Sequence, residues 1–172
     1  GYIFITTAAL IQMRSEAELA AVLAHEIAHV VERHIVKALG IRATNDSAMQ
    51  VLGKIIAGNT LSANALFDQA VGKAIEILFS KGLSLEDEYL ADKLGLLMVT
   101  LAGYDSASYF EYLQRIYPII EKNHQQLSKT HPAIPLRIEH LKIAYKDAGL
   151  LTMGGYKNKR RLEKYKIKVN AK

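Results

Sequence analysis

Residues 25–29 of the chain read His-Glu-Ile-Ala-His, which is an HExxH pattern. In an α-helix, residues four apart lie one turn along the axis and only about 40° apart around it. The imidazoles of His25 and His29 can therefore reach one metal ion from the same face. Glu26 is turned by about 100° from His25, where its carboxylate can hold water bound to that metal. The pattern predicts metal-assisted hydrolysis with Glu26 as the general base.

The residues around this pattern are almost wholly apolar, as the run LAAVLAHEIAHVV shows. Burying two histidines and a glutamate without partners costs several kcal/mol, on the order of 2–7 for each group, and metal ligation removes that cost. The chain has no cysteine, so any metal must be held by nitrogen and oxygen atoms. The alternative is that both histidines are surface residues, or hydrogen-bonded core residues that bind no metal.

A catalytic zinc site takes three protein ligands and leaves a fourth position for water. A histidine six residues after His29 would indicate another class of zinc peptidase, but that position is isoleucine. Glu88 and Asp92 lie four residues apart in a later segment and so share one helix face. We predict that Glu88 is the third ligand and that Asp92 accepts a hydrogen bond from a ligand imidazole. A solvated acidic helix start is the better interpretation for Glu86 and Asp87.

The HExxH pattern requires a helix to position it, and the sequence supplies the signals for one. Ser15 and Glu18 form a capping-box pattern, which predicts a helix over residues 16–39 that ends at Gly40. Apolar residues cover most of its circumference, so we expect a central, buried helix.

The rest of the chain reads mainly as helices. Residues 2–7 (YIFITT) are rich in aromatic and β-branched types and predict a strand. Further helices are predicted over residues 48–57, 62–79, 84–101, 106–126 and 135–148, with a rigid turn at Thr130-His131-Pro132. The expected fold is mainly α with a small N-terminal β element.

The net charge of +5 comes from the C-terminus, where eight Lys or Arg residues follow position 156 against Glu163 alone. We predict a catalytic domain over residues 1–150 and a basic tail over residues 151–172. The tail is expected to be a solvated helix or arm; an anionic membrane surface is a possible partner, and nucleic acid ranks lower because no RNA-binding signature is present. No stretch is long and apolar enough to predict a transmembrane helix.

Three stretches resemble the HtpX- and BepA-like zinc metallopeptidases, which are relatives of the type I CAAX prenyl protease. They are ELAAVLAHEIAHVVERH, EYLADKLG and THPAIPLRI, in the family's order, and with YIFITTAALI they span residues 2–138. The resemblance implies a zincin-like catalytic domain of the gluzincin type with one Zn²⁺ per chain. It also implies cleavage of peptide bonds in protein substrates, such as misfolded or envelope proteins, as part of quality control.

The resemblance also implies roles for individual residues. The metal ligands would be His25, His29 and Glu88, with Glu26 as general base and Asp92 behind a ligand histidine. His131 would stabilise the oxyanion, and Arg137 would support His131. The edge strand that pairs with an extended substrate would contain Ile3, Phe4, Ile5 and Thr6. His34, His124 and His140 match no motif and are interpreted as structural or surface residues.

The HtpX and prenyl-protease branches of the family have transmembrane helices, and this sequence predicts none. The chain therefore resembles the branch found in the periplasm or cell envelope. Because it begins at Gly1 rather than at Met, we expect a fragment or a processed protein. The alternative function is a chaperone or binding module that keeps zinc for stability and cleaves little. The sequence does not indicate the physiological substrate, the cleavage preference, the oligomeric state or the activation mechanism.

Overall fold

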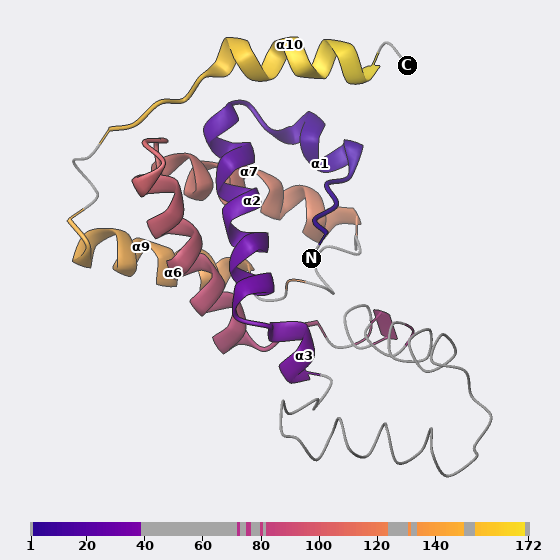
Figure 1. Cartoon of the computed structure of the whole chain (residues 1–172), viewed down its shortest axis with the longest axis vertical. Helices are drawn as coiled ribbons and strands as arrows, with labels where there is room; N and C mark the ends of the chain where they lie inside the picture. Colours follow the sequence, from indigo (N-terminus) through magenta and orange to yellow (C-terminus); the bar gives the residue numbers. More distant parts are fainter. Residues whose placement is uncertain are drawn as a thin grey trace, which may run out of the picture.

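The computed structural model describes residues 2–38, 72, 75, 76, 80, 82–123, 131, 134–149 and 154–170. The helices with assigned bounds are α1 (Thr7–Gln12), α2 (Glu16–Val31), α3 (His34–Ala38), α6 (Leu85–Leu101), α7 (Ala107–Asn123), α9 (Ile134–Asp147) and α10 (Lys159–Asn170) (Figure 1). The prediction of a mainly helical fold is confirmed.

The predicted N-terminal strand is not found, and no strand occurs elsewhere in these described ranges. Residues 2–6 have no regular secondary structure. A strand needs a partner for its backbone hydrogen bonds. The segment ends where the Thr6 side chain accepts a hydrogen bond from the Ala9 backbone N–H at 3.1 Å and caps α1.

Helix α2 begins as predicted, because Ser15 Oγ accepts a hydrogen bond from the Glu18 N–H at 3.2 Å. It ends at Val31, so the prediction of one helix to residue 39 is wrong. Arg33 has φ of 55°, a left-handed conformation that a continuing helix does not allow, and the chain restarts as α3. The helix is also not buried all round, since Val30 and Val31 are exposed.

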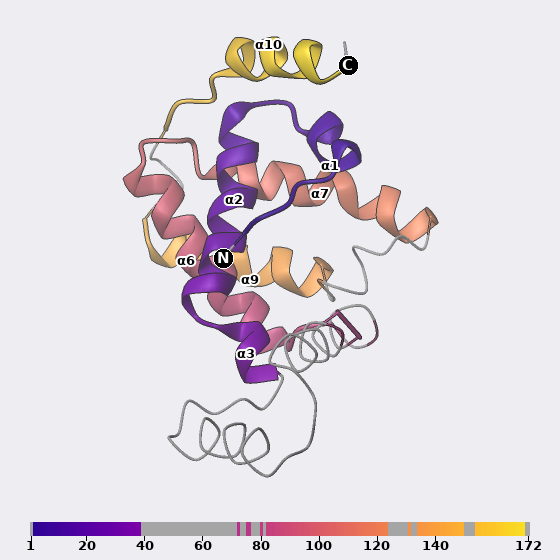
Figure 2. The ribbon, with the colours of Figure 1, turned by 45° about the vertical axis from the view of Figure 1, so that its right-hand side comes forward.

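Helix α6 lies beside α2 in both views of the ribbon (Figures 1 and 2). Ser84 caps it by accepting a hydrogen bond from the Asp87 N–H at 3.1 Å. Gly95 brings the two helices together, because a Cβ added there would lie 3.1 Å from the His25 backbone nitrogen. This close approach places one face of α6 against the HExxH residues.

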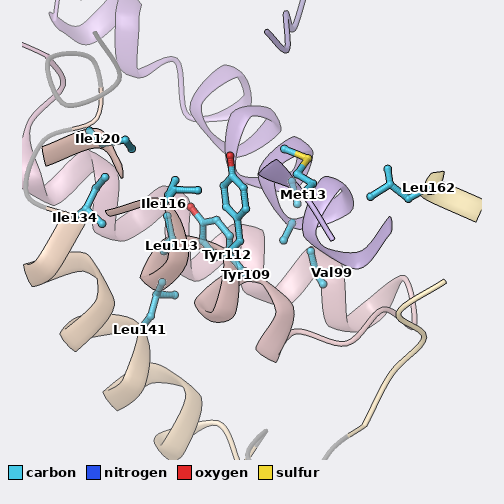
Figure 3. Close-up of a cluster of buried hydrophobic side chains, with 12 residues drawn as sticks. Met13, Val99, Tyr109, Tyr112, Leu113, Ile116, Ile120, Ile134, Leu141 and Leu162 are labelled. Atoms are coloured by element: carbon cyan, nitrogen blue, oxygen red, sulfur yellow. The ribbon is translucent and has the colours of Figure 1, made fainter. Parts of the chain in front are cut away.

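Helices α7 and α9 complete the layer that supports α2 and α6, and both lie within their predicted limits or within one residue of them. The hydrophobic core between these helices contains aromatic and aliphatic side chains, including Tyr109, Tyr112, Leu113, Ile116 and Leu141 (Figure 3). The helix predicted over residues 48–57 and most of the one over residues 62–79 lie outside the described residues.

The basic C-terminal segment packs on the helical body instead of forming a solvated arm. Helix α10 lies at the end of the molecule where α2 begins (Figures 1 and 2). Leu162 is 1% exposed and belongs to the hydrophobic core. Lys166 Nζ donates to the backbone oxygens of Met13 and, at 3.2 Å, of Ile11. The division into residues 1–150 and 151–172 stays a prediction. None of the helices described has the length and apolar character needed to cross a membrane.

Candidate metal centre

Helix α2 presents two histidines to α6, as the HExxH spacing predicts. His25 is 3% exposed and His29 is 7% exposed, and their Nε2 atoms lie 2.9 Å apart. Glu88, fully buried in the first turn of α6, has carboxylate oxygens 3.6 Å from His25 Nε2 and 3.4 Å from His29 Nε2. Two imidazole nitrogens and one carboxylate therefore converge on one point.

The donor set fits a metal ion. Ligand atoms of His25, His29, Glu88 and His131 all lie within 4.8 Å of one another. Two histidines and a glutamate are a ligand set that catalytic zinc uses. The two Nε2 atoms face each other, so at most one of them can carry a hydrogen on this contact. A metal held by His25 and His29 would use both lone pairs and remove that need.

Asp92 lies one turn after Glu88 and behind His25, as the i, i+4 spacing predicts. Its Oδ1 is 2.9 Å from His25 Nδ1, so the other ring nitrogen of His25 faces the ligand cluster. Burial alone would raise the pKa of Asp92, but Arg137 and His25 lower it to about 2. An ionised carboxylate at this position favours the tautomer of His25 that has its proton on Nδ1.

Arg137 is 2% exposed and contacts the two buried carboxylates of α6, Glu88 and Asp92. Its Nη1 is 2.7 Å from Glu88 Oε2, and its Nε and Nη2 donate to Asp92 at 2.9 and 2.6 Å. It also donates to the Tyr109 hydroxyl and lies 3.4 Å from His25 Nε2, and His131 is not among its described contacts. One buried guanidinium therefore contacts one candidate ligand, Glu88, and also Asp92, the partner of the candidate ligand His25.

Tyr109 is a residue of this network that the sequence did not reveal. Its hydroxyl donates to Asp92 Oδ1 at 2.9 Å and accepts from Arg137 Nη2 at 2.7 Å. In the sequence it is one aromatic residue among the apolar positions of a predicted helix, and nothing in that pattern indicates a polar role.

His131 and Glu26 lie on the more open side of the cluster. His131 Nδ1 is 3.0 Å from Glu88 Oε1, and His131 Nε2 is 3.5 Å from Glu26 Oε1. The side chains of His131 and Glu26 are 16% and 31% exposed, far more than the three ligand candidates. The structure therefore brings together the residues of all three motifs, whereas the roles of Glu26 and His131 stay predictions.

His34 was interpreted from the sequence as a structural or surface residue, and its contact with His29 was not predicted. On a continuous helix it would be turned well away from His29, but the break at Arg33 returns it to the buried side. His34 is fully buried, its Nδ1 lies 2.7 Å from His29 Nδ1, and its Nε2 lies 3.4 Å from Asp87 Oδ1. No glycine or asparagine precedes it to signal the left-handed turn.

The remaining predicted residues lie elsewhere or outside the described part. His140 stacks on Tyr89 with ring centroids 3.8 Å apart. His124 is outside the described residues. In the N-terminal segment, Ile5 packs partly against the core while Tyr2 and Phe4 are 91% and 89% exposed.

The electrostatics suit a cation. Burial and the neighbouring His25 lower the pKa of His29 to about 3, so its ring is neutral and has a free lone pair at neutral pH. Burial opposes ionisation of Glu88, but His131, His25 and Arg137 hold its pKa far below the usual range. Burial and Arg137 lower the pKa of His25, yet Asp92 and Glu88 outweigh them and raise it overall.

A helix with an HExxH pattern, facing a glutamate from a neighbouring helix, defines the catalytic site of a metallopeptidase. Residues 1–144 match peptidase family M48. The chain belongs to this family, whose members are metalloprotease hydrolases, and the resemblance predicted from the sequence is confirmed.

Two curated relatives are similar over part of their length. The chain is 28% identical over 122 residues to a Vibrio cholerae protein described as a beta-barrel assembly-enhancing protease, covering 67% of this chain and 24% of the relative. It is 30% identical over 106 residues to the mitochondrial metalloendopeptidase OMA1 of Arabidopsis thaliana, covering 61% of this chain and 20% of that protein. The chain thus spans a quarter or less of either relative. No solved structure matches it.

Proposed function

We propose that the chain is the catalytic domain of a zinc-dependent metalloendopeptidase that hydrolyses peptide bonds of protein substrates. The observation that supports this most is the convergence of His25 Nε2, His29 Nε2 and the Glu88 carboxylate, 2.9 to 3.6 Å apart. A purely structural zinc site is closed by four protein ligands. Here His131 is the fourth residue of the cluster, but it and the neighbouring Glu26 are 16% and 31% exposed, so this side of the site is more open.

The three converging residues would hold the ion, and zinc, when bound, polarises a carbonyl group and lowers the pKa of water toward about 7. Glu26 accepts the proton of the attacking water and returns it to the leaving amine. His131 Nε2 donates a hydrogen bond to the carbonyl oxygen as negative charge develops on it. Arg137 and Asp92 hold Glu88 and His25 in position.

We also propose that the N-terminal segment pairs with an extended substrate. Exposure alternates along it, with Tyr2, Phe4 and Thr6 exposed and Ile3 and Ile5 half-buried, which is the period of an extended chain lying on a surface. Such a segment can add a substrate strand through its free backbone groups. Phe4→Pro removes one backbone N–H and is expected to raise KM more than Phe4→Ala, while equal KM values would refute this role.

Similarity to known relatives is the basis for proposing a substrate class and a location. The name of the Vibrio cholerae relative associates that protein with the assembly of β-barrels. We propose that this chain acts on misfolded or envelope proteins in the periplasm or cell envelope of a bacterium.

The test compares the zinc-loaded wild type with Glu26→Gln on an unfolded protein such as casein. Positioned acid–base groups contribute roughly 10² to 10⁴ in rate, so turnover should fall by at least about 10² while zinc content is unchanged. Glu32→Gln removes a carboxylate just beyond the same helix and is the matched control. Turnover of Glu26→Gln close to that of the control would refute the assignment.

The alternative, a chaperone or binding module that retains zinc for stability, has one structural argument. Arg137, Asp92 and Tyr109 form a fully buried polar network behind the ligands, which would also suit a site kept for stability. Full zinc occupancy without chelator-sensitive cleavage would favour it.

A further inference from the structure

Each of the two ligand histidines has its second ring nitrogen against a buried side chain. For His25 this partner is Asp92, at 2.9 Å. For His29 it is another histidine, since His29 Nδ1 and His34 Nδ1 are 2.7 Å apart. His34 has no exposed surface, so water does not replace this contact.

The direction of the hydrogen bond between these two histidines decides whether His29 can bind a metal. If His29 Nδ1 donates, the His29 Nε2 lone pair is free, and it points toward Glu88 and His25. If His34 donates instead, the proton of neutral His29 must be on Nε2, where it blocks ligation.

Asp87 favours the first direction. When His34 accepts on Nδ1, its own proton is on Nε2, which lies 3.4 Å from Asp87 Oδ1. That proton lies near a carboxylate oxygen, an electrostatic contact without a hydrogen bond. In the reverse direction the lone pair of His34 Nε2 would face the carboxylate, which is repulsive.

We propose that His34, supported by Asp87, is a positioning residue that fixes the tautomer and ring orientation of His29 for metal binding. The inference deepens the proposed function and rests on it. This role also explains the helix break at Arg33. The left-handed turn there returns His34 to the buried side, where it contacts His29. Helix α6 would then contribute two neighbouring residues to the site. Glu88 would bind the metal, and Asp87 would support His34.

The first experiment measures the zinc affinity of metal-free variants by competition with a chromophoric chelator. Residues that orient a ligand histidine typically change metal affinity by about 10- to 100-fold. His34→Leu, which fills the volume without an acceptor, should weaken zinc binding by that factor. His34→Asn, whose side-chain oxygen can accept from His29 Nδ1, should restore most of it.

Asp87→Ala and Glu86→Ala form a matched pair, because both remove a carboxylate from the first turn of α6. Both variants keep His34, so they test the proposal even if replacing His34 prevents folding. Asp87→Ala should weaken zinc binding by about tenfold, while Glu86→Ala should leave it unchanged. Equal affinities in the pair, or wild-type affinity in His34→Leu, would overturn the proposal.

The second experiment assigns the ring protons by ¹⁵N NMR of the metal-free wild type. We expect His29 to carry a proton on Nδ1, and His34 to carry its proton on Nε2. Neutral His29 with its proton on Nε2 would overturn the proposal, whatever the enzyme cleaves. Zinc binding without cleavage would instead refute the proposed function, and the affinities and tautomers would still decide the role of His34.

Discussion

At the residue scale, the site is stabilised because its buried negative charges lie next to a buried positive charge. Glu88 and Asp92 are both ionised and nearly inaccessible, and Arg137 is the guanidinium that contacts both. Removing one partner of a buried ion pair costs about 3–5 kcal/mol, because the other charge stays buried without compensation. Charge matching therefore holds Glu88 and Asp92, the two carboxylates of the proposed metal site, in place.

The raised pKa of His25 predicts how zinc affinity depends on pH. In the metal-free protein, a proton on His25 competes with zinc at every pH below that raised pKa, which lies above the usual 6.5. His29, with a pKa of about 3, does not compete in this range. Zinc affinity should therefore be constant above the His25 pKa and fall by about tenfold per pH unit below it, for one displaced proton.

The measurement is a chelator competition between pH 5 and pH 8.5. A fall of about a hundredfold per pH unit would mean that two protons are displaced, and that His29 is not neutral. Asp92→Asn removes the carboxylate that raises the His25 pKa and should shift the onset of the fall to lower pH.

At the scale of elements, the sequence predicted what local signals encode. The capping pattern at Ser15 placed the start of α2 correctly, and α6 begins within one residue of its predicted start at residue 84. At each start a serine side chain satisfies a backbone donor within its own turn. The i, i+4 spacings predicted which residues share a helix face. Contacts between elements were not predictable in this way, which is why the polar role of Tyr109 was missed.

The end of α2 shows why other features escaped prediction. Arg33 is a residue that usually favours helix, yet it adopts a left-handed conformation here, so tertiary contacts override its local preference. His34 makes such contacts, with His29 and Asp87. The strand expected over residues 2–7 failed for a related reason, because composition does not supply a pairing partner.

Gly95→Ala tests the close packing of α2 and α6. The new Cβ would lie 3.1 Å and 3.2 Å from the backbone N and Cα of His25, which cannot move aside like a flexible side chain. Alanine gains about 1 kcal/mol of helix propensity, but overpacking costs about 1–3 kcal/mol, so we expect a net loss of stability. Zinc affinity should fall as well, because Glu88 shifts relative to His25.

Denaturation and zinc titration of Gly95→Ala measure both effects. Gly72→Ala adds the same methyl group at a helical position where nothing lies within 4 Å, so it is the control. A Gly95→Ala protein with wild-type stability and zinc affinity would show that the contact does not position the site.

At the scale of the whole molecule, the basic C-terminal segment is both part of the core and a charged surface. Leu162 is buried, while Lys159, Arg160 and Lys164 are exposed on the same helix. Deleting the segment would therefore remove core packing together with charge. Only substitutions of the exposed residues can separate the two contributions.

We propose that this exposed basic face of α10 attracts anionic membrane surfaces. Replacing Lys159, Arg160 and Lys164 together by Gln should weaken binding to vesicles containing phosphatidylglycerol, since each basic residue near such a surface contributes about 1 kcal/mol. Stability should change little, because surface substitutions usually stay within about 0.5 kcal/mol each. Sedimentation with vesicles at low and high salt measures the binding. Vesicle binding equal to that of the wild type would exclude this face as the contact.

The central claim is that one zinc ion is held by His25, His29 and Glu88, and its position can be measured directly. A crystal of the zinc-loaded protein, with data collected at the zinc absorption edge, locates the ion by its anomalous signal. We predict one peak at about 2.0–2.2 Å from His25 Nε2, His29 Nε2 and a Glu88 oxygen. A peak bound through His25 Nδ1, a peak outside this cluster, or no peak in protein saturated with zinc would contradict this prediction.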